Sequence, residues 1–94
     1  MSDTLNNQEI QKALARLTDW KRAGESIVKE FERKDFDGAM KFVNKVAALA
    51  TQQNHHPDID IRWNKVRLAL STHASGGLTA LDFQVAAQID DIAT

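Results

Sequence analysis

The sequence contains no cysteine, which excludes disulfide bonds, thiolate metal sites and catalysis by a thiol nucleophile. It has one proline and four glycines among 94 residues, so few positions interrupt regular secondary structure. The side chains that titrate near neutral pH are three histidines, His55, His56 and His73. Proton transfer by imidazole is therefore the chemistry that the composition leaves most available.

A net charge of either sign is also nearly absent. Twelve basic and thirteen acidic side chains give a formal net charge of −1, so no overall positive field holds nucleic acid or an anionic membrane surface. The longest mostly apolar stretch, Val46 to Ala50, is far shorter than the roughly 20 residues that span a bilayer. The first nine residues lack the basic start and the apolar segment of a secretory signal. We expect a cytoplasmic protein without nucleic-acid or membrane partners.

The apolar content is sufficient for one folded domain. Hydrophobic residues make up 43% and charged residues 27% of the chain, as is typical of a globular protein rather than a disordered one. At this length, two independent domains would each be too small to be stable. Residues 1–94 are therefore predicted to form a single domain with one core.

Hydrophobic periodicity predicts three helices and three strands. Apolar residues recur at spacings of three and four in the helical segments and alternate with polar ones in the strands. The expected helices cover about 7–17, 35–53 and 79–92, and the expected strands cover 25–33, 59–63 and 66–71. This order indicates an α+β fold of two layers, with an antiparallel sheet and the helices packed on one face. The other sheet face is left to water, a partner subunit or a ligand.

Polar residues mark the starts of the three helices. Asn6 and Glu9 have the spacing of a capping box, and Asp35 can cap the second helix. Thr79 and Asp82 have the same capping-box spacing at the third helix. We therefore assign Asp82 to the cap, with the orientation of a histidine as the alternative role of its carboxylate.

Two aromatic and two acidic residues receive structural interpretations. Trp20 and Trp63 are expected in the core or in a pocket wall. Asp90 and Asp91 lie at the end of the last helix, where the helix dipole disfavours acidic groups, so we expect them to be merely exposed.

A short hairpin is predicted to gather the histidines. Asn64 and Lys65 form the expected two-residue turn, because Asn tolerates a positive φ. The resulting register pairs Trp63 with Val66, Ile61 with Leu68, Ile59 with Leu70 and, beyond the strands, Pro57 with Thr72. One step further, His56 lies opposite His73, with His55 one residue away. All three imidazoles are therefore expected at one place.

This convergence leaves several chemical interpretations. A lone histidine is most often a surface or packing residue, whereas three that meet favour a functional site. Three histidines are enough in number to bind zinc. However, neighbouring residues of an extended chain, such as His55 and His56, point in opposite directions, and a His-x-x-x-His spacing is absent. Ser71 and Ser75 lie near His73 without a third member for nucleophilic catalysis. The pattern favours acid–base chemistry, such as the elimination or addition of water, without a metal.

The same residues carry a family resemblance. The ordered segments are His55-His56-Pro57, Trp63-Asn64-Lys65-Val66, Ser71-Thr72-His73 and Gly77-Leu78-Thr79-x-x-Asp82. This set resembles the signature of the pterin-4a-carbinolamine dehydratases, and a weaker likeness extends upstream through residues 34–54 to Trp20. The resemblance covers most of the chain.

The resemblance implies a four-stranded antiparallel sheet with helices on one face, the fourth strand lying near residues 20–23. It implies the dehydration of 4a-hydroxytetrahydrobiopterin to quinonoid dihydropterin in pterin recycling, by a homodimer or homotetramer that needs no metal or organic cofactor. The family's active-site histidines fall on His55, His56 and His73. Pro57, Asp82 and Trp20 fall on substrate-binding or supporting positions. One departure is Thr51, where family members usually carry a charged residue or histidine.

Two function classes follow. In the first, His55 or His73 protonates the departing 4a-hydroxyl, another histidine accepts the N5 proton, and His56 mainly holds the pterin. In the second, the chain is a non-catalytic interaction or assembly factor with the same fold. The three histidines favour the enzyme, since a scaffold does not need them. A nucleic-acid binder is disfavoured by the charge of −1.

Overall fold

The structure, a computed structural model, describes residues 4–94 and confirms the expected α+β class. Its elements, in chain order, are α1 (Asn7–Ala15), β1 (Lys21–Ala23), β2 (Ser26–Glu32), α2 (Phe36–Gln53), β3 (Asp58–Arg62), β4 (Lys65–Leu70), the 3₁₀ helix η1 (His73–Ser75) and α3 (Ala80–Ala93). No helix within residues 4–94 has the length and apolar character needed to cross a membrane.

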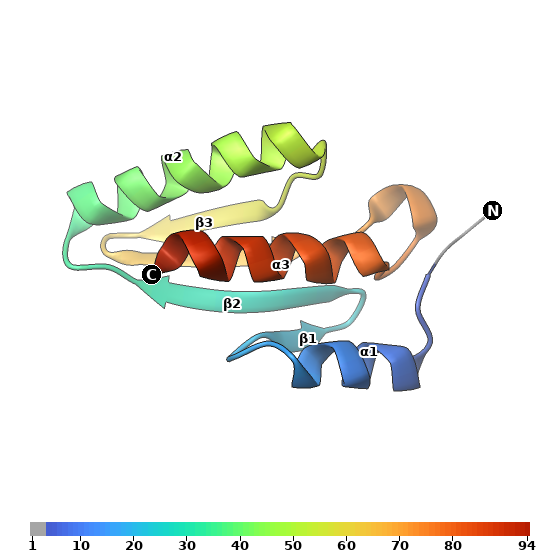
Figure 1. Ribbon diagram of the computed structural model, residues 1–94. Coiled ribbons are helices and arrows are strands. Elements are labelled where there is room, and N and C mark those ends of the chain that lie inside the picture. The colour runs from blue at the N-terminus through green and yellow to red at the C-terminus, as the bar shows by residue number, and fades with distance from the viewer. Residues whose placement is uncertain (1–3) are drawn as a thin grey trace.

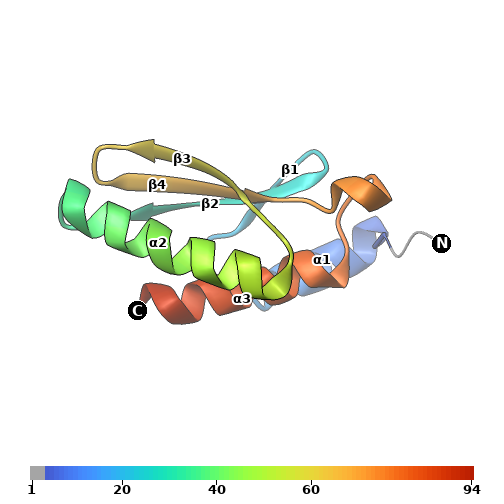
Figure 2. The same cartoon turned by 90° about the horizontal axis from the view of Figure 1, so that it is seen from above.

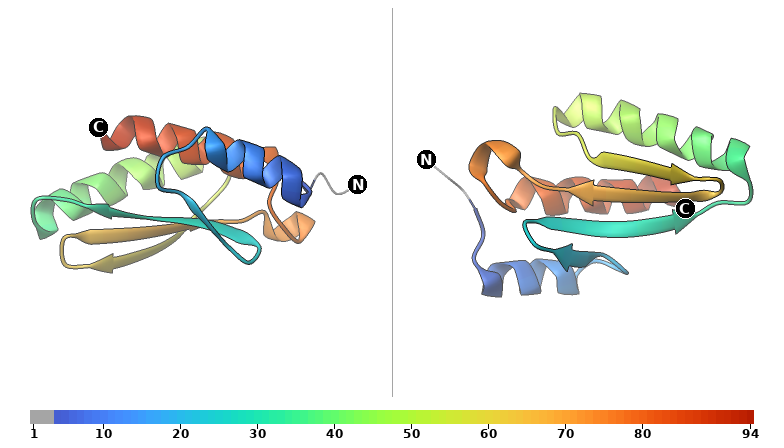
Figure 3. Two further views of the ribbon diagram at one scale, coloured as in Figure 1. Left: turned by 90° about the horizontal axis from the view of Figure 1, so that it is seen from below. Right: turned by 180° about the vertical axis from the view of Figure 1, so that it is seen from behind.

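The strands form one antiparallel sheet in the order β1-β2-β4-β3. The three α-helices lie on one side of this sheet, which gives the expected two layers (Figures 1 and 2). The fourth strand, β1, is only three residues long and lies where the family resemblance placed it. In the two further views, no helix of the described residues 4–94 covers the opposite face of the sheet (Figure 3).

The core lies between the sheet and the helices. Alternate residues of the two central strands face the helices and are fully or almost fully buried: Ile27, Phe31, Val66, Leu68 and Leu70. They pack against Ala39, Phe42, Val46, Val85, Ala86 and Ile89 from α2 and α3. Burial of each large aliphatic side chain stabilises the fold by about 1.5–3 kcal/mol. This packing fixes the end of α2 relative to the start of α3.

The helix ends follow the expected capping chemistry. Asn6 and Glu9 exchange the two bonds of a capping box at 2.9 and 2.8 Å, and Asp35 accepts the amide of Gly38 at 2.8 Å. The second helix ends at Gln53 and is capped by Asn54, whose φ of 51° is left-handed. Asparagine tolerates this conformation better than most residues, and it turns the chain out of the helix axis.

The β3–β4 hairpin differs from the predicted register by two residues. Ile61 pairs with Val66, so the turn consists of Trp63 and Asn64. The cause is a contact with the end of β2: Asn64 donates its side-chain amide to the carbonyl of Arg33 at 3.0 Å, and the Arg33 amide donates to the Asn64 carbonyl at 2.8 Å. A shift of two keeps the same side chains on the same sheet face.

The revised turn also changes the place of Trp63. This residue has a φ of 53° and its side chain is 66% exposed, so its expected position in the core or a pocket wall is wrong.

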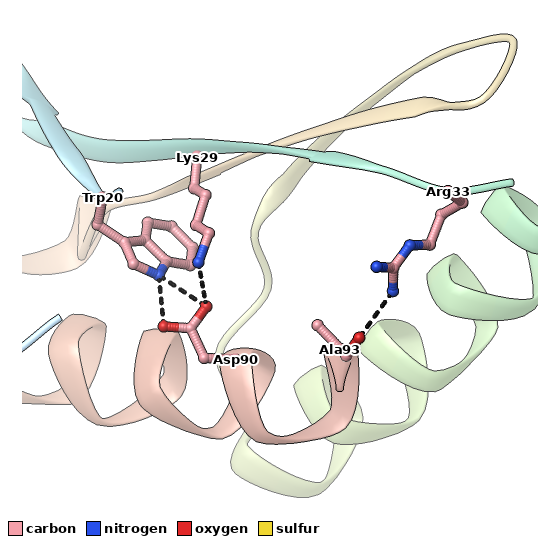
Figure 4. A network of polar contacts seen from close by, with 5 residues as sticks. All are labelled: Trp20, Lys29, Arg33, Asp90 and Ala93. Carbon is pink, nitrogen blue, oxygen red and sulfur yellow. Dashed lines mark hydrogen bonds and ion pairs between the residues drawn. The ribbon is translucent and has the colours of Figure 1, made fainter. Parts of the chain in front are cut away.

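Trp20 is buried in the core, as expected, and is part of a polar network with α3 (Figure 4). Its indole N–H lies 3.1 Å from both carboxylate oxygens of Asp90. The ammonium of Lys29 donates to the same carboxylate at 2.8 Å. Asp90 is thus a half-buried anchor between α3 and β2, and the expectation that it is merely exposed is wrong.

The same helix is also bound near its last residue. Arg33 donates to the carbonyl of Ala93 at 2.9 Å (Figure 4). Two contacts therefore hold the C-terminal half of α3 against β2 and the residue that follows it.

Candidate functional site

Four segments meet towards one end of the domain: the end of α2, the end of β4, η1 and the first turn of α3 (Figures 1 and 2). His55 and His56 follow α2, His73 opens η1, and Asp82 lies in the first turn of α3. The fold therefore brings all the predicted histidine segments to the same region, although the predicted strand register was wrong.

His55 is held in place by both its backbone and its side chain. Its amide donates to the carbonyl of Ala50 at 3.0 Å, which ties it to the last turn of α2. Its imidazole is buried, with 9% exposed, and Nε2 lies 2.5 Å from Oδ1 of Asp82. A short contact between a ring nitrogen and a carboxylate is a strong, charge-assisted hydrogen bond.

Asp82 is completely buried and uses both carboxylate oxygens. Oδ1 faces His55, while Oδ2 accepts the amide of Thr79 at 2.9 Å and the hydroxyl of Thr72 at 2.8 Å. The predicted capping box is confirmed. The sequence interpretation chose between capping and orienting a histidine, whereas this carboxylate does both.

This arrangement leaves one nitrogen of His55 available. Nδ1 has no hydrogen-bond partner within residues 4–94. In the same part of the chain, Oε1 of Gln88 is the one side-chain polar atom that is both buried and without a hydrogen-bond partner. Nδ1 of His55 also lacks a partner but is not such a buried atom, so it touches solvent. An imidazole bound to a carboxylate through one nitrogen and open at the other can donate or accept a proton at the open one.

His56 and His73 have different surroundings. Both side chains are exposed, and neither forms a hydrogen bond with His55 or Asp82. The observed register, continued beyond β3, places His55 opposite Thr72 rather than His56 opposite His73. Regular pairing of β4 ends at Leu70, and a single bridge from Thr72 to Gly77 closes the turn that contains His73.

Pro57 and Trp20 lie outside the hydrogen-bonded centre. Pro57 is half-buried and directly precedes β3, where it can stiffen the chain after the histidine pair. Trp20 binds Asp90, which follows Asp82 by two helical turns, a distance of about 12 Å along α3. The structure gives Trp20 no contact with the histidines.

A cavity of about 320 Å³ lies beside this centre, lined by Thr72, Ser75, Thr79, Ala80 and Leu81. Its volume is at the lower end of the range for small-molecule sites. A larger hollow of about 490 Å³ between α1 and α3 is lined by residues such as Leu17 and Phe83 and by no histidine. Residues 4–94 contain no cluster of three or more His, Cys, Asp or Glu side chains placed to bind a metal ion.

Comparison with known proteins identifies the family. The profile described as Pterin 4 alpha carbinolamine dehydratase matches residues 3–92. The chain belongs to this family. A relative from Roseiflexus castenholzii, provisionally named a pterin-4-alpha-carbinolamine dehydratase, is 54% identical over 92 residues, which cover 98% of this chain and 99% of the relative. A Chloroflexus aurantiacus protein with the same provisional name is 51% identical over 88 residues, covering 94% and 95% of the two chains.

Solved structures support the dehydratase fold. A transcriptional coactivator/pterin dehydratase from Brucella melitensis superposes with a TM-score of 0.92 at 33% identity, covering 97% of this chain and 99% of that one. A pterin dehydratase-like RuBisCO assembly factor of the alpha-carboxysome superposes with a TM-score of 0.69 at 23% identity, covering 81% and 90%. At 23% identity, the similarity to the assembly factor supports a shared fold and nothing more.

Two residues of this dehydratase-family site were missed by the sequence interpretation: Thr72 and, beyond its capping role, Thr79. Their hydroxyl oxygens lie 2.8 Å apart, and Thr72 reaches Asp82. A signal existed, because Thr72 directly precedes His73 and Thr79 is three residues before Asp82. What the sequence does not show is that these two short segments face each other.

Proposed function

We propose that this chain dehydrates 4a-hydroxytetrahydrobiopterin, a pterin-4a-carbinolamine, to quinonoid dihydropterin by histidine acid–base catalysis. The observation that carries the proposal is His55, which is fixed by the buried Asp82 through Nε2 while Nδ1 remains open to solvent. The family membership and the provisional names of the relatives supply the substrate class and the reaction.

The reaction needs one proton donor and one proton acceptor. The bond between C4a and the hydroxyl oxygen breaks as that oxygen receives a proton, and water leaves. N5 loses its proton, and the electron pair of the N5–H bond becomes the new C4a=N5 double bond. Protons are therefore moved but not consumed, and no oxidation state changes, so the reaction requires neither a metal nor an organic cofactor. Imidazoles suit both roles because they exchange protons near neutral pH.

We assign the two proton transfers to His55 and His73, with either as the acid. His55 supplies a fixed ring with one free nitrogen. His73 is exposed and is positioned through its neighbour Thr72, which binds the same carboxylate as His55. His56, exposed beside His55, is assigned mainly to holding the pterin, with Pro57 supporting its backbone. We place this activity in the recycling of the pterin used by aromatic amino acid hydroxylases, in the cytoplasm.

The direct test is the rate at which 4a-hydroxytetrahydropterin loses water, followed by stopped-flow ultraviolet absorbance with and without the purified chain. We expect the wild-type chain to accelerate the reaction in proportion to its concentration. A His55→Ala/His73→Ala double variant, purified identically, controls for a contaminating enzyme. A wild-type rate equal to the uncatalysed background would reject the proposal.

The second candidate is a non-catalytic interaction or assembly factor. The fold it shares with the pterin dehydratase-like RuBisCO assembly factor favours this alternative. The alternative does not account for the buried carboxylate that fixes His55. Absence of both turnover and pterin binding, the latter measured by isothermal titration calorimetry, would favour it over the dehydratase.

We further propose that the chain forms a homo-oligomer through the outer edge of β3, which the sheet order leaves unpaired. The three exposed large apolar side chains of the described residues include Ile59 and Trp63 on or beside this strand. If two β3 strands pair antiparallel about Ile61, Ile59 faces Trp63 of the second copy. Asp60 then faces Arg62 of the second copy, on both sides of the axis. Pairing about Asp60 would instead place two carboxylates opposite each other, which is unfavourable.

The proposed edge register predicts a charge effect on association. Asp60→Arg sets two arginines opposite each other at both symmetric positions, so we expect the dimer Kd to rise by about tenfold. Adding Arg62→Asp to the same chain restores opposite charges and should restore most of the affinity. Sedimentation velocity over a range of concentrations measures both. Equal Kd values for wild type, single and double variants would contradict this register, and Glu32→Lys, away from the edge, is the charge-change control.

A further inference from the structure

We infer that Thr72 is a positioning residue whose hydroxyl, directed by Thr79, holds Asp82 so that His55 keeps its proton on Nε2 and presents Nδ1 to the ligand. The observations are the 2.8 Å contact from Thr72 to Asp82 and the 2.8 Å contact between the two threonine hydroxyls. The effect on catalysis rests on the proposed dehydratase function, whereas the effect on the histidine tautomer does not.

Counting protons fixes the direction of these hydrogen bonds. As a carboxylate, Asp82 only accepts, so the single hydroxyl proton of Thr72 must point at Oδ2. Thr72 therefore accepts in its other contact, and the hydroxyl of Thr79 is the donor. Thr79 also contacts the same carboxylate directly, because its backbone amide donates to Oδ2 at 2.9 Å. The result is a closed ring of hydrogen bonds that begins and ends on Thr79 and passes through Thr72 and Oδ2 of Asp82.

This ring determines what remains for His55. Oδ2 is occupied by the Thr79 amide and the Thr72 hydroxyl, so the carboxylate can rotate only by breaking both hydrogen bonds. Oδ1 then has a fixed direction and accepts from Nε2 of His55. With its proton held on Nε2, a neutral His55 has its lone pair on Nδ1, the nitrogen that touches solvent.

Within residues 4–94, the Thr72 hydroxyl forms no hydrogen bond other than those to Asp82 and Thr79. Thr72 precedes η1, yet its side chain makes no capping bond to that helix. The residue lies beyond β4, in a segment whose regular pairing has ended. Because it directly precedes His73, its bond to Asp82 also fixes the point at which the chain carrying His73 leaves the sheet. One hydroxyl therefore positions both histidines that we assign to proton transfer.

The test compares Thr72→Val, which keeps the shape and removes the hydroxyl, with Thr72→Ser, which keeps the hydroxyl. Thr94→Val is the matched control, because it removes a threonine hydroxyl bond of 2.9 Å at the opposite end of α3. The ligand-free proteins are labelled with ¹⁵N, and the His55 tautomer is determined from long-range nitrogen–proton correlations. Turnover and KM are then measured with 4a-hydroxytetrahydropterin.

We expect wild type, Thr72→Ser and Thr94→Val to hold the His55 proton on Nε2. In Thr72→Val the proton should distribute between both nitrogens, and kcat should fall by about tenfold with little change in KM. Thr72→Ser should recover most of that loss, which a role of the methyl group in packing would not explain.

Three results would overturn the inference. The first is a wild-type His55 protonated on Nδ1, which needs no variant and remains informative if Thr72→Val fails to fold. The second is a Thr72→Val protein with an unchanged tautomer and unchanged kcat. The third is a Thr72→Ser protein as impaired as Thr72→Val. If the wild type is inactive but the tautomer changes as expected, the positioning role stands and the dehydratase assignment fails.

Discussion

His55→Ala and His73→Ala each lower kcat for the dehydration of 4a-hydroxytetrahydropterin by about 10²–10⁴-fold, the range expected when a general acid or base is removed. His56→Ala instead raises KM more than it lowers kcat. The distinction follows from the site: His55 is fixed by Asp82, and His73 follows the threonine that binds the same carboxylate. His56 is exposed and has no such support.

The measurement is steady-state and single-turnover stopped-flow kinetics on the three variants, with urea unfolding to confirm that each is folded. Added imidazole provides a positive control. It should partly restore His73→Ala, whose site is exposed, and restore His55→Ala less, because that ring is 9% exposed. Full activity in all three variants would show that the histidines are not the site, even in a chain that is an active dehydratase.

The helices and the longer strands were predictable because their signals are local. The helical spacing of Ala39 and Val46 and the alternation of Val66 and Leu68 each indicate burial on one face, and the structure buries all four. The strand β1 lacks such a signal, because its three residues are all exposed. It was expected only through the family resemblance.

The hairpin shows where local signals end. Asn64 is a good turn residue, and the sequence places it first in the turn, whereas the structure places it second. The register is decided by two hydrogen bonds between Asn64 and Arg33, which lies thirty-one residues earlier in the chain. No sequence pattern within the hairpin indicates these bonds. Because the register moved by two and not by one, the face assignments remained correct.

The sequence predicts the residues of the candidate site better than it predicts the hydrogen bonds between them. The capping box of Thr79 and Asp82 is visible in the sequence, and the structure confirms it. The bond from Asp82 to His55 joins residues 27 positions apart, one in α3 and one just after α2, and it depends on how α2 and α3 pack. Sequence spacing alone could not select His55 over His56 as the buried partner, since the choice is made by the left-handed turn at Asn54.

Asp82→Asn should be the most damaging single-atom change in the molecule. Two donors converge on Oδ2, so the one oxygen of the new amide will remain there and its NH₂ group will face His55. An NH₂ group cannot accept the Nε2 proton, so His55 must move its proton to Nδ1 and lose its lone pair on the open side. A wrong tautomer of a catalytic histidine costs several orders of magnitude in rate, and we expect kcat to fall by about 10³-fold or more.

The matched control is Asp90→Asn on the same helix. Asp90 is likewise a carboxylate that accepts from N–H donors, in its case Trp20 and Lys29, although it is only partly buried. Both substitutions should reduce the free energy of unfolding by about 1–3 kcal/mol, because each weakens hydrogen bonds to a charged group. Only Asp82→Asn should also cause the large loss of kcat, since Asp90 lies two helical turns from Asp82 and binds no histidine. Equal losses of activity in the two variants would assign the effect to stability, and wild-type kcat in a folded Asp82→Asn chain would show that the bond between Asp82 and His55 has no part in the reaction.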